Sequence, residues 1–226
     1  MTNRRARVHQ AYQPINTLLT KSVADSEFAF HGDALTYAVV TRTDLNGYSS
    51  WARGKDAALR AEQLDAFFSR VVPLIDNAGG VYFRDEGDCI VGLFSDYFGR
   101  GANFEKVEKF CMNASSLVYG PASLSAKSCI ACGEVAIFQK RHERGTDDWS
   151  AEGEPFVRAA RLEGAVSSIQ QVVVTEEDYD RHFSTTNIGA PGAPSGWSIE
   201  RESSQVPGLG ASGGWIDLVY LRRRVS

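Results

Sequence analysis

The stretch TRTDLNGYSS, residues 41–50, decides the fold of this chain. It follows an apolar run at residues 35–40 and precedes a long amphipathic segment, so the predicted order is strand, turn, helix. Asp44 would then lie at the carboxyl end of the strand. The helix is expected over residues 49–77.

A second stretch, GGVYFRDEGDCIVGLF at residues 79–94, predicts a β-hairpin with strands at 81–84 and 89–94. Asp88 lies at its turn. If the hairpin pairs beside the first strand, Asp44 and Asp88 meet, and a hard divalent cation such as Mg²⁺ or Mn²⁺ relieves their repulsion. Either Asp alone is better explained as a turn residue, because Asp hydrogen-bonds the local backbone. The two together favour a metal site.

The turn after Asp44 is a candidate phosphate site. Residues 45–50 would offer backbone N–H groups at a helix N-terminus, with Ser49 or Ser50 as the cap. Metals beside phosphates suggest phosphoryl chemistry.

The rest of the chain alternates predicted strands and helices, which indicates an α/β sandwich of the α+β kind. The expected elements are a helix at 104–119, a strand at 125–138, a helix containing Arg161, a strand at 171–175 and a closing strand at 215–221. Residues 1–34 are interpreted as an N-terminal arm and 35–226 as one catalytic domain. Residues 184–214, rich in Gly, Pro and Ser, are expected to form a flexible loop.

Composition narrows the class of protein. The chain has 226 residues, 43% of them hydrophobic, and a net charge of −4, which argues against a general nucleic-acid surface. It contains neither an apolar stretch of the ~20 residues that a membrane span needs nor a signal peptide, so we expect a cytoplasmic protein. Cys129 and Cys132 form a CxxC, but strand residues three apart face opposite sides, which disfavours a metal or redox role.

Three blocks together resemble the catalytic domain of class III nucleotide cyclases. They are Asp44-Leu45-Asn46-Gly47-Tyr48-Ser49, Gly87-Asp88, and GEPFVRAARL at residues 153–162. The resemblance covers roughly residues 36–175. It implies a ferredoxin-like βαββαβ core and a head-to-tail homodimer, with active sites at the interface between the two copies.

The resemblance also implies a reaction. A nucleoside triphosphate would be converted to its 3′,5′-cyclic monophosphate and pyrophosphate, with two divalent cations, Mg²⁺ or Mn²⁺, held by Asp44, Asp88 and the carbonyl of Leu45. The nucleotide would contact the turn formed by Leu45, Asn46, Gly47, Tyr48 and Ser49.

Arg161 matches the family's helix Arg, which reaches from the partner subunit to stabilise charge on the α-phosphate. Arg158, three residues earlier, would assist it. A surface salt bridge is the alternative role for Arg161. Two family residues are missing: Val157 replaces the ribose-orienting Asn, and Leu209 of Gly208-Leu209-Gly210 replaces a phosphate-binding Lys.

The positions that choose the base are Arg84 and Ser150, which match neither the adenylate nor the guanylate cyclase pattern. In this respect the chain resembles the stand-alone bacterial pyrimidine cyclases of anti-phage defence, whose cyclic product is read by a separate effector protein. Arg84 and Ser150 could donate to the two carbonyls of uracil, and Tyr48 would narrow the pocket, so UTP is expected before CTP.

Two alternatives stay open at this point. One is an adenylate cyclase with atypical base recognition. The other is a catalytically inactive cyclase-like module that only binds a nucleotide.

Overall fold

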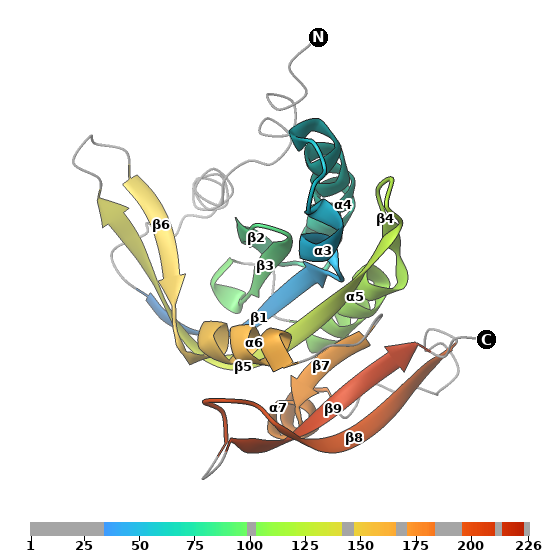
Figure 1. Ribbon diagram of the computed structural model, residues 1–226. Helices are drawn as coiled ribbons and strands as arrows, with labels where there is room; N and C mark the ends of the chain where they lie inside the picture. Colours follow the sequence, from blue (N-terminus) through green and yellow to red (C-terminus); the bar gives the residue numbers. More distant parts are fainter. Residues whose placement is uncertain are drawn as a thin grey trace.

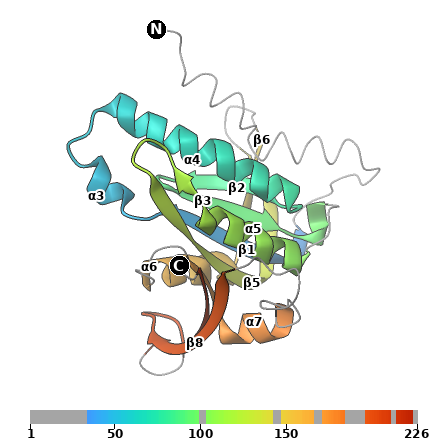
Figure 2. The same cartoon turned by 90° about the vertical axis from the view of Figure 1, so that its right-hand side faces the viewer.

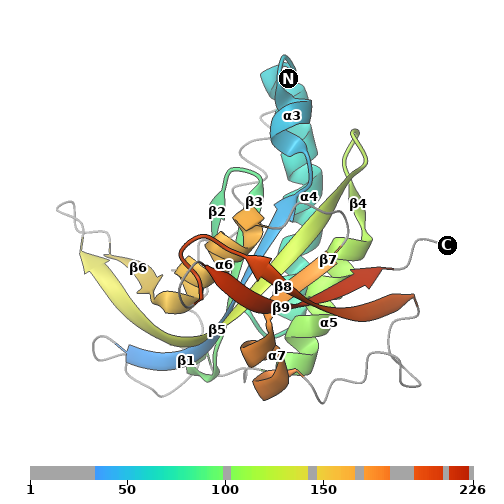
Figure 3. The same cartoon turned by 60° about the horizontal axis from the view of Figure 1, so that its bottom comes forward.

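The computed structural model describes residues 34–98, 103–141, 147–165, 171–183, 196–210 and 214–223. Over these residues nine strands form one sheet (Figure 1). Its main path runs β2 (Val81–Glu86), β3 (Cys89–Phe94), β1 (Ala34–Leu45), β5 (Leu124–Arg141), β7 (Gln171–Thr175), β9 (Trp215–Arg223) and β8 (Trp197–Gln205). Figure 3 shows β5 crossing the molecule, with β4 (Val118–Tyr119) and β6 (Asp147–Glu152) pairing at its two ends.

The first four strands of this path form the predicted ferredoxin-like core. β1 pairs antiparallel with both β3 and β5, and β2 pairs antiparallel with β3. The helix α4 (Ala57–Asn77) connects β1 to β2, and α5 (Phe104–Ser116) leads from β3 towards β5. This order, strand-helix-strand-strand-helix-strand, confirms the βαββαβ prediction.

Helices cover both faces of the sheet, which confirms the α/β sandwich (Figure 2). α4 and α5 pack on one face, where Phe67 and Phe110 join a large apolar cluster with Val39 of β1. α6 (Glu154–Ala165) packs on the other face, where Ala159 contacts the cluster around Val40. Cys129 and Cys132 belong to clusters on opposite faces, as their spacing predicted.

The single helix expected over residues 49–77 is wrong, because the structure has two. α3 (Tyr48–Ala52) is short, and α4 begins after Asp56, whose carboxylate caps it by accepting from Leu59 N at 2.8 Å. Gly54, with φ +75°, lies in the break. The next predicted helix is also shorter than expected, since β4 occupies residues 118–119.

Residues 184–214 are not one loop. β8 forms at residues 197–205 and pairs with β9 along its length, and the edge position explains its polar sequence. β6 and α7 (Glu176–His182) were also not predicted. The N-terminal arm, 1–34, lies outside the described residues except for Ala34, which begins β1. None of the described helices has the length and hydropathy of a membrane span.

Candidate active site

The end of β1 and the β2–β3 turn bring Asp44 and Asp88 together. Asp44 is paired in register with Cys89, the residue after Asp88. The amide of Leu45 donates to the carbonyl oxygen of Asp88 at 3.2 Å. The hairpin pairs beside the first strand, as the sequence predicted, and this pairing places both carboxylates at the same end of the core.

Both carboxylates are crowded by negative charge. Burial raises the pKa of Asp44 to about 7, and the nearby carboxylates of Glu163 and Asp88 add to the rise. Burial also raises the pKa of Asp88, again with a contribution from Glu163. Burial first, and the neighbouring carboxylates second, therefore disfavour ionisation of both groups, and a bound cation would offset this effect.

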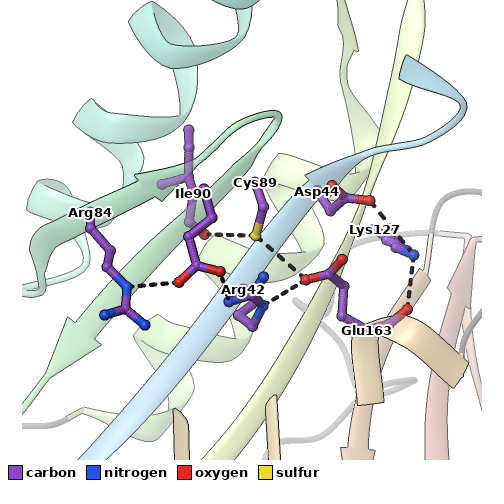
Figure 4. Close-up of polar contacts among 8 residues, drawn as sticks. Arg42, Asp44, Arg84, Cys89, Ile90, Lys127 and Glu163 are labelled. Atoms are coloured by element: carbon purple, nitrogen blue, oxygen red, sulfur yellow. Dashed lines mark hydrogen bonds and ion pairs between the residues drawn. The ribbon is translucent and has the colours of Figure 1, made fainter. Parts of the chain in front are cut away.

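Lys127 supplies part of that compensation. Its Nζ lies 3.6 Å from Oδ2 of Asp44 and donates to the backbone carbonyl of Glu163 at 2.9 Å (Figure 4). Its positive charge lowers the pKa of both Asp44 and Asp88, but the pKa of each stays above its usual value.

The donor set suits Mg²⁺ or Mn²⁺ bound together with a substrate. The part of the chain that the structure describes contains no group of three or more His, Cys, Asp or Glu side chains arranged to hold a metal ion. Mg²⁺ is usually held by one or two carboxylates, with waters and substrate phosphates completing its shell. Asp44 and Asp88, two hard oxygen donors with raised pKa values, match that pattern.

The turn after Asp44 is shaped by Gly47, which adopts φ +75° at the N-terminus of α3. No side chain caps this helix, so the expected cap at Ser49 or Ser50 is wrong. A five-residue helix also provides only a small dipole, so its N-terminus attracts a phosphate less than the predicted long helix would. Two hydrogen bonds to Ser125 hold Asn46 in place. Its backbone N–H donates to the Ser125 carbonyl at 2.9 Å, and its side-chain Nδ2 donates to the Ser125 hydroxyl at 3.2 Å.

Tyr48 lies beside the carboxylates. Burial raises the pKa of its phenol, and the charge of Asp88 raises it further. Its ring packs against Trp51 at a centroid distance of 5.7 Å. The side chain of Leu45 is buried in the core, 1% exposed, and has no donor atom, so its backbone carbonyl is the candidate metal ligand.

Arg161 does not join Asp44 and Asp88 within one chain. It is exposed on α6 and donates to the carbonyl of Gly208 in the β8–β9 connection. Gly208 has φ +77°, and a Cβ there would lie 2.8 Å from the Arg161 guanidinium carbon. Glu163, two residues later, turns towards β1, as side chains two apart on a helix do not share a face.

Three further positions singled out by the resemblance give a mixed result, two of them on α6 and one in the β8–β9 connection. Arg158 is engaged elsewhere, because it forms a 3.1 Å ion pair with the buried Asp178 and donates to the Cys132 carbonyl. In this structure Arg158 is therefore directed away from Arg161, and its assistance to Arg161 stays a prediction. Val157 is 43% exposed, one turn before Arg161, whereas Leu209 is buried in the core and only 5% exposed.

The two base-selecting positions differ in exposure. Arg84 is half exposed, pairs with Glu86 at 2.7 Å, and lies over the rings of Phe83 and Phe156 at 5.2 and 5.7 Å. Ser150 is on β6 and only 7% exposed, so little of it reaches the surface of one chain.

Sequence reasoning missed three charged residues of this region, Arg42, Lys127 and Glu163. The only signal was a charge inside an apolar strand for Arg42 and Lys127, and the Arg-Leu-Glu order on α6 for Glu163. Their convergence is visible only in the folded chain, where Arg42 bonds to Glu163 at 2.6 Å.

No protein-family model and no curated protein matches this sequence. The fold does match solved structures. A rhodopsin-guanylyl cyclase catalytic core with converted specificity, in complex with ATPαS, aligns with a TM-score of 0.63 at 12% identity, over 86% of this chain and 100% of that one. The adenylyl cyclase CyaB from P. aeruginosa gives 0.63 at 14%, over 87% and 100%. The guanylyl cyclase Cya2 gives 0.60 at 15%, over 87% and 96%. The chain has the fold of class III cyclase catalytic domains.

Proposed function

We propose that this chain, which has the class III cyclase fold, is a nucleotide cyclase. The observation that carries the proposal is the pair Asp44 and Asp88, adjacent at the end of β1 and crowded by a third carboxylate. The reaction is in-line attack of the ribose 3′-hydroxyl on the α-phosphorus, which closes the cyclic diester and expels pyrophosphate.

The roles of the chain's residues follow from their chemistry. Asp44, Asp88 and the Leu45 carbonyl would hold two divalent cations, Mg²⁺ or Mn²⁺. A bound cation supplies charge neutralisation for the triphosphate and acidifies the attacking hydroxyl. Asn46 and Gly47 fix the path of the turn beside the triphosphate, and Tyr48 and Ser49 complete its nucleotide-facing side.

Arg161 is proposed to stabilise the α-phosphate of a nucleotide bound to a second copy of the chain. Within one chain its guanidinium turns to Gly208, while Glu163 turns to the carboxylate region. A head-to-tail homodimer would bring Arg161 of one copy to Asp44 and Asp88 of the other. A planar guanidinium with several donors suits a trigonal-bipyramidal phosphorus.

UTP is the proposed substrate, with CTP second. The matched structures include both adenylyl and guanylyl cyclases and one with converted specificity, so the fold itself leaves the base open. Arg84 supports a base that presents carbonyls, because its half-exposed guanidinium is oriented by Glu86 and by two aromatic rings. Ser150 would contribute a second donor, and Tyr48 would narrow the pocket.

A cyclic pyrimidine nucleotide would act as a signal that a separate effector protein reads. The anti-phage role belongs to this proposal and depends on the identity of the product.

The test is incubation of the purified protein with Mn²⁺ and each of ATP, GTP, CTP and UTP, with products resolved by chromatography and mass. Cyclic UMP, absent with Asp44→Ala and retained with Asp85→Asn, supports the full proposal. Asp85 is an exposed residue of the same hairpin, so it is a matched control. Cyclic AMP alone would favour the atypical adenylate cyclase and overturn the base assignment.

A nucleotide-binding module without turnover is the second candidate. Two observations favour it: Leu209 is buried where the family has a phosphate-binding Lys, and Val157 replaces the ribose-orienting Asn. On this alternative, UTP with Mn²⁺ raises the melting temperature by mass action while no cyclic product forms.

A further inference from the structure

Arg42 is a charged residue in a position that the fold would fill with an apolar one. Successive strand residues alternate between faces, so Arg42 lies on the same side of β1 as Ala38 and Val40. Both of these belong to the apolar cluster beneath α6, and both are 0% exposed. Arg42 itself is 9% exposed.

Two carboxylates from different elements hold the buried guanidinium. Nε of Arg42 bonds to Oε2 of Glu163 at 2.6 Å, and the NH1 group bonds to Oε2 of Glu86 at 2.7 Å. Figure 4 shows Arg42 between Glu163 and the strand that carries Arg84. Arg84 in turn pairs with the other oxygen of Glu86 at 2.7 Å.

These bonds join the three segments that carry the proposed site. β1 carries Asp44, two residues after Arg42 on the same face. Glu86 is the last residue of β2, two residues before Asp88. Glu163 belongs to α6, two residues after Arg161. Arg42 is thus the side chain through which all three segments are linked by ion pairs.

Stability alone is a weak reason for such an arrangement. A buried ion pair loses solvation when it forms, and replacing it with apolar residues of similar volume is often neutral or stabilising. An apolar residue at position 42 would extend the cluster of Ala38 and Val40. The arrangement is better explained by what it does to its neighbours.

We infer that Arg42 is a positioning residue for the carboxylate site: by bridging Glu86 and Glu163 it fixes the hairpin and α6 against β1 and neutralises Glu163. Asp44 and Asp88 are then the carboxylates left to take a divalent cation. The inference rests on the proposed function for its consequence in turnover, but its consequence for cation binding is separate.

The contribution of Arg42 comes from its planar fork. A guanidinium presents donors in two directions and can hold two carboxylates at once, whereas a Lys ammonium is a single point charge. Without Arg42, the mostly buried Glu163 carboxylate loses its ion pair and keeps the weaker Cys89 thiol as a donor, with Sγ 3.6 Å from Oε2. In that state it would compete for the cation and displace α6. Residues that orient metal-binding carboxylates typically contribute 10–100-fold to affinity or activity.

The experiment measures Mn²⁺ binding directly, by electron paramagnetic resonance of free Mn²⁺ with and without UTP, beside kcat, KM and the melting temperature. Arg42→Met is expected to weaken Mn²⁺ binding about tenfold and lower kcat by a similar factor, with little change in the KM for UTP. Arg42→Lys keeps the positive charge, but it should recover only part of the lost Mn²⁺ affinity and only part of the lost kcat.

A double variant, R42M/E163Q, separates positioning from stability. Glu86 keeps its ion pair with Arg84, so no charge of the bridge is left unpaired. The melting temperature should therefore return towards that of the parent, while Mn²⁺ affinity and kcat stay low. Recovery of parental Mn²⁺ affinity and kcat in the double variant would overturn the inference. Arg201→Met is the matched control, because Arg201 also bridges two carboxylates, Glu176 and Asp180, on α7. Its Mn²⁺ affinity should equal that of the parent.

Failure of the inference and failure of the proposed function give different results. If the parent binds Mn²⁺ but forms no cyclic product, the cyclase proposal fails. The Arg42 inference is then still tested by comparing the Mn²⁺ affinity of Arg42→Met with that of the parent. If the parent is active and Arg42→Met binds Mn²⁺ and turns over equally well, the positioning inference alone is wrong. A parent that binds no Mn²⁺, with or without UTP, overturns both.

Discussion

The carboxylate end of β1 and the exposed face of α6 are the two charged regions of the proposed site, and they differ in burial and in the sign of their charge. At the first, Asp44 is mostly buried, with its side chain 15% exposed, and lies among other carboxylates. At the second, Arg161 is exposed and donates to a backbone carbonyl. Lys127 and Arg42 offset part of the negative charge of the first region. The Arg161 guanidinium of the second region is directed to Gly208 and not to the carboxylates of the same chain. On our proposal, a second copy of the chain brings its Arg161 to these carboxylates.

The largest effect is expected at the carboxylate region. Asp44→Ala removes a proposed metal ligand, and loss of several kcal/mol of charge stabilisation corresponds to a fall of about 10³-fold or more in turnover. Product formation at saturating Mn²⁺ measures it, with Asp85→Asn as control. An Asp44→Ala variant that keeps a tenth of parental activity would show that the metal assignment is wrong.

The Arg161 region should give the next largest effect. Arg161→Ala is expected to lower kcat about 10²-fold with little change in KM, as for loss of one donor to a charged transition state. Arg161→Lys should recover little, because Lys lacks the planar fork. Arg181→Ala serves as control, since Arg181 is an exposed helix residue paired with Glu177 on α7. If instead KM rises while kcat is unchanged, Arg161 contributes to binding of the nucleotide and not to stabilisation of the transition state.

The same contrast explains what the sequence could predict. The core strands were predictable because their apolar runs end at Gly and Asp turns, and pairing of β1 with β3 then brings Asp44 to Asp88. The edge strands β6 and β8 were missed because their polar residues do not produce an apolar pattern. The break before α4 had a local signal, Gly54 followed by the capping Asp56, that the amphipathic pattern obscured.

The charge balance of the site was not predictable from local patterns. Glu163 lies 119 positions after Asp44 in the chain, and only the packing of α6 on β1 brings the two together. Arg42 and Lys127 were visible as charges in apolar strands, but their partners come from other elements. Such contacts depend on tertiary structure, which periodicity does not specify.

A smaller effect is expected for base choice, which the proposal assigns to Arg84 on β2. Arg84→Met should lower kcat/KM for UTP about tenfold, the usual worth of a hydrogen bond from a charged donor, and leave that for ATP nearly unchanged. Competition between UTP and ATP in one reaction measures the ratio. Equal losses for both nucleotides would mean that Arg84 supports the fold or a phosphate and does not select the base.

The smallest effect concerns stability of the carboxylate region without metal. An unfolded Asp loses its proton near pH 4, whereas the raised pKa of Asp44 lets the folded chain keep it until about pH 7. The folded state therefore binds more protons in this interval, and this group makes the free energy of unfolding fall as pH rises through it.

Asp44→Asn should remove that dependence. We expect the variant to be more stable than the parent by on the order of 1–2 kcal/mol at about pH 8 in metal-free buffer, and equally stable near pH 4. Urea unfolding at the two pH values measures it. A variant that is less stable than the parent at the higher pH would mean that Asp44 is already compensated there.

The most direct test mixes two inactive variants, Asp44→Ala and Arg161→Ala, after partial unfolding and joint refolding. In a head-to-tail dimer, half of the pairs formed would be mixed, and each mixed pair would contain one site with Asp44, Asp88 and Arg161 all intact. Cyclase activity should then return to about a quarter of the parental value. A mixture as inactive as its two components, with mixed dimers demonstrated by mass, would contradict the claim that the carboxylates of one copy and Arg161 of the other form one active site.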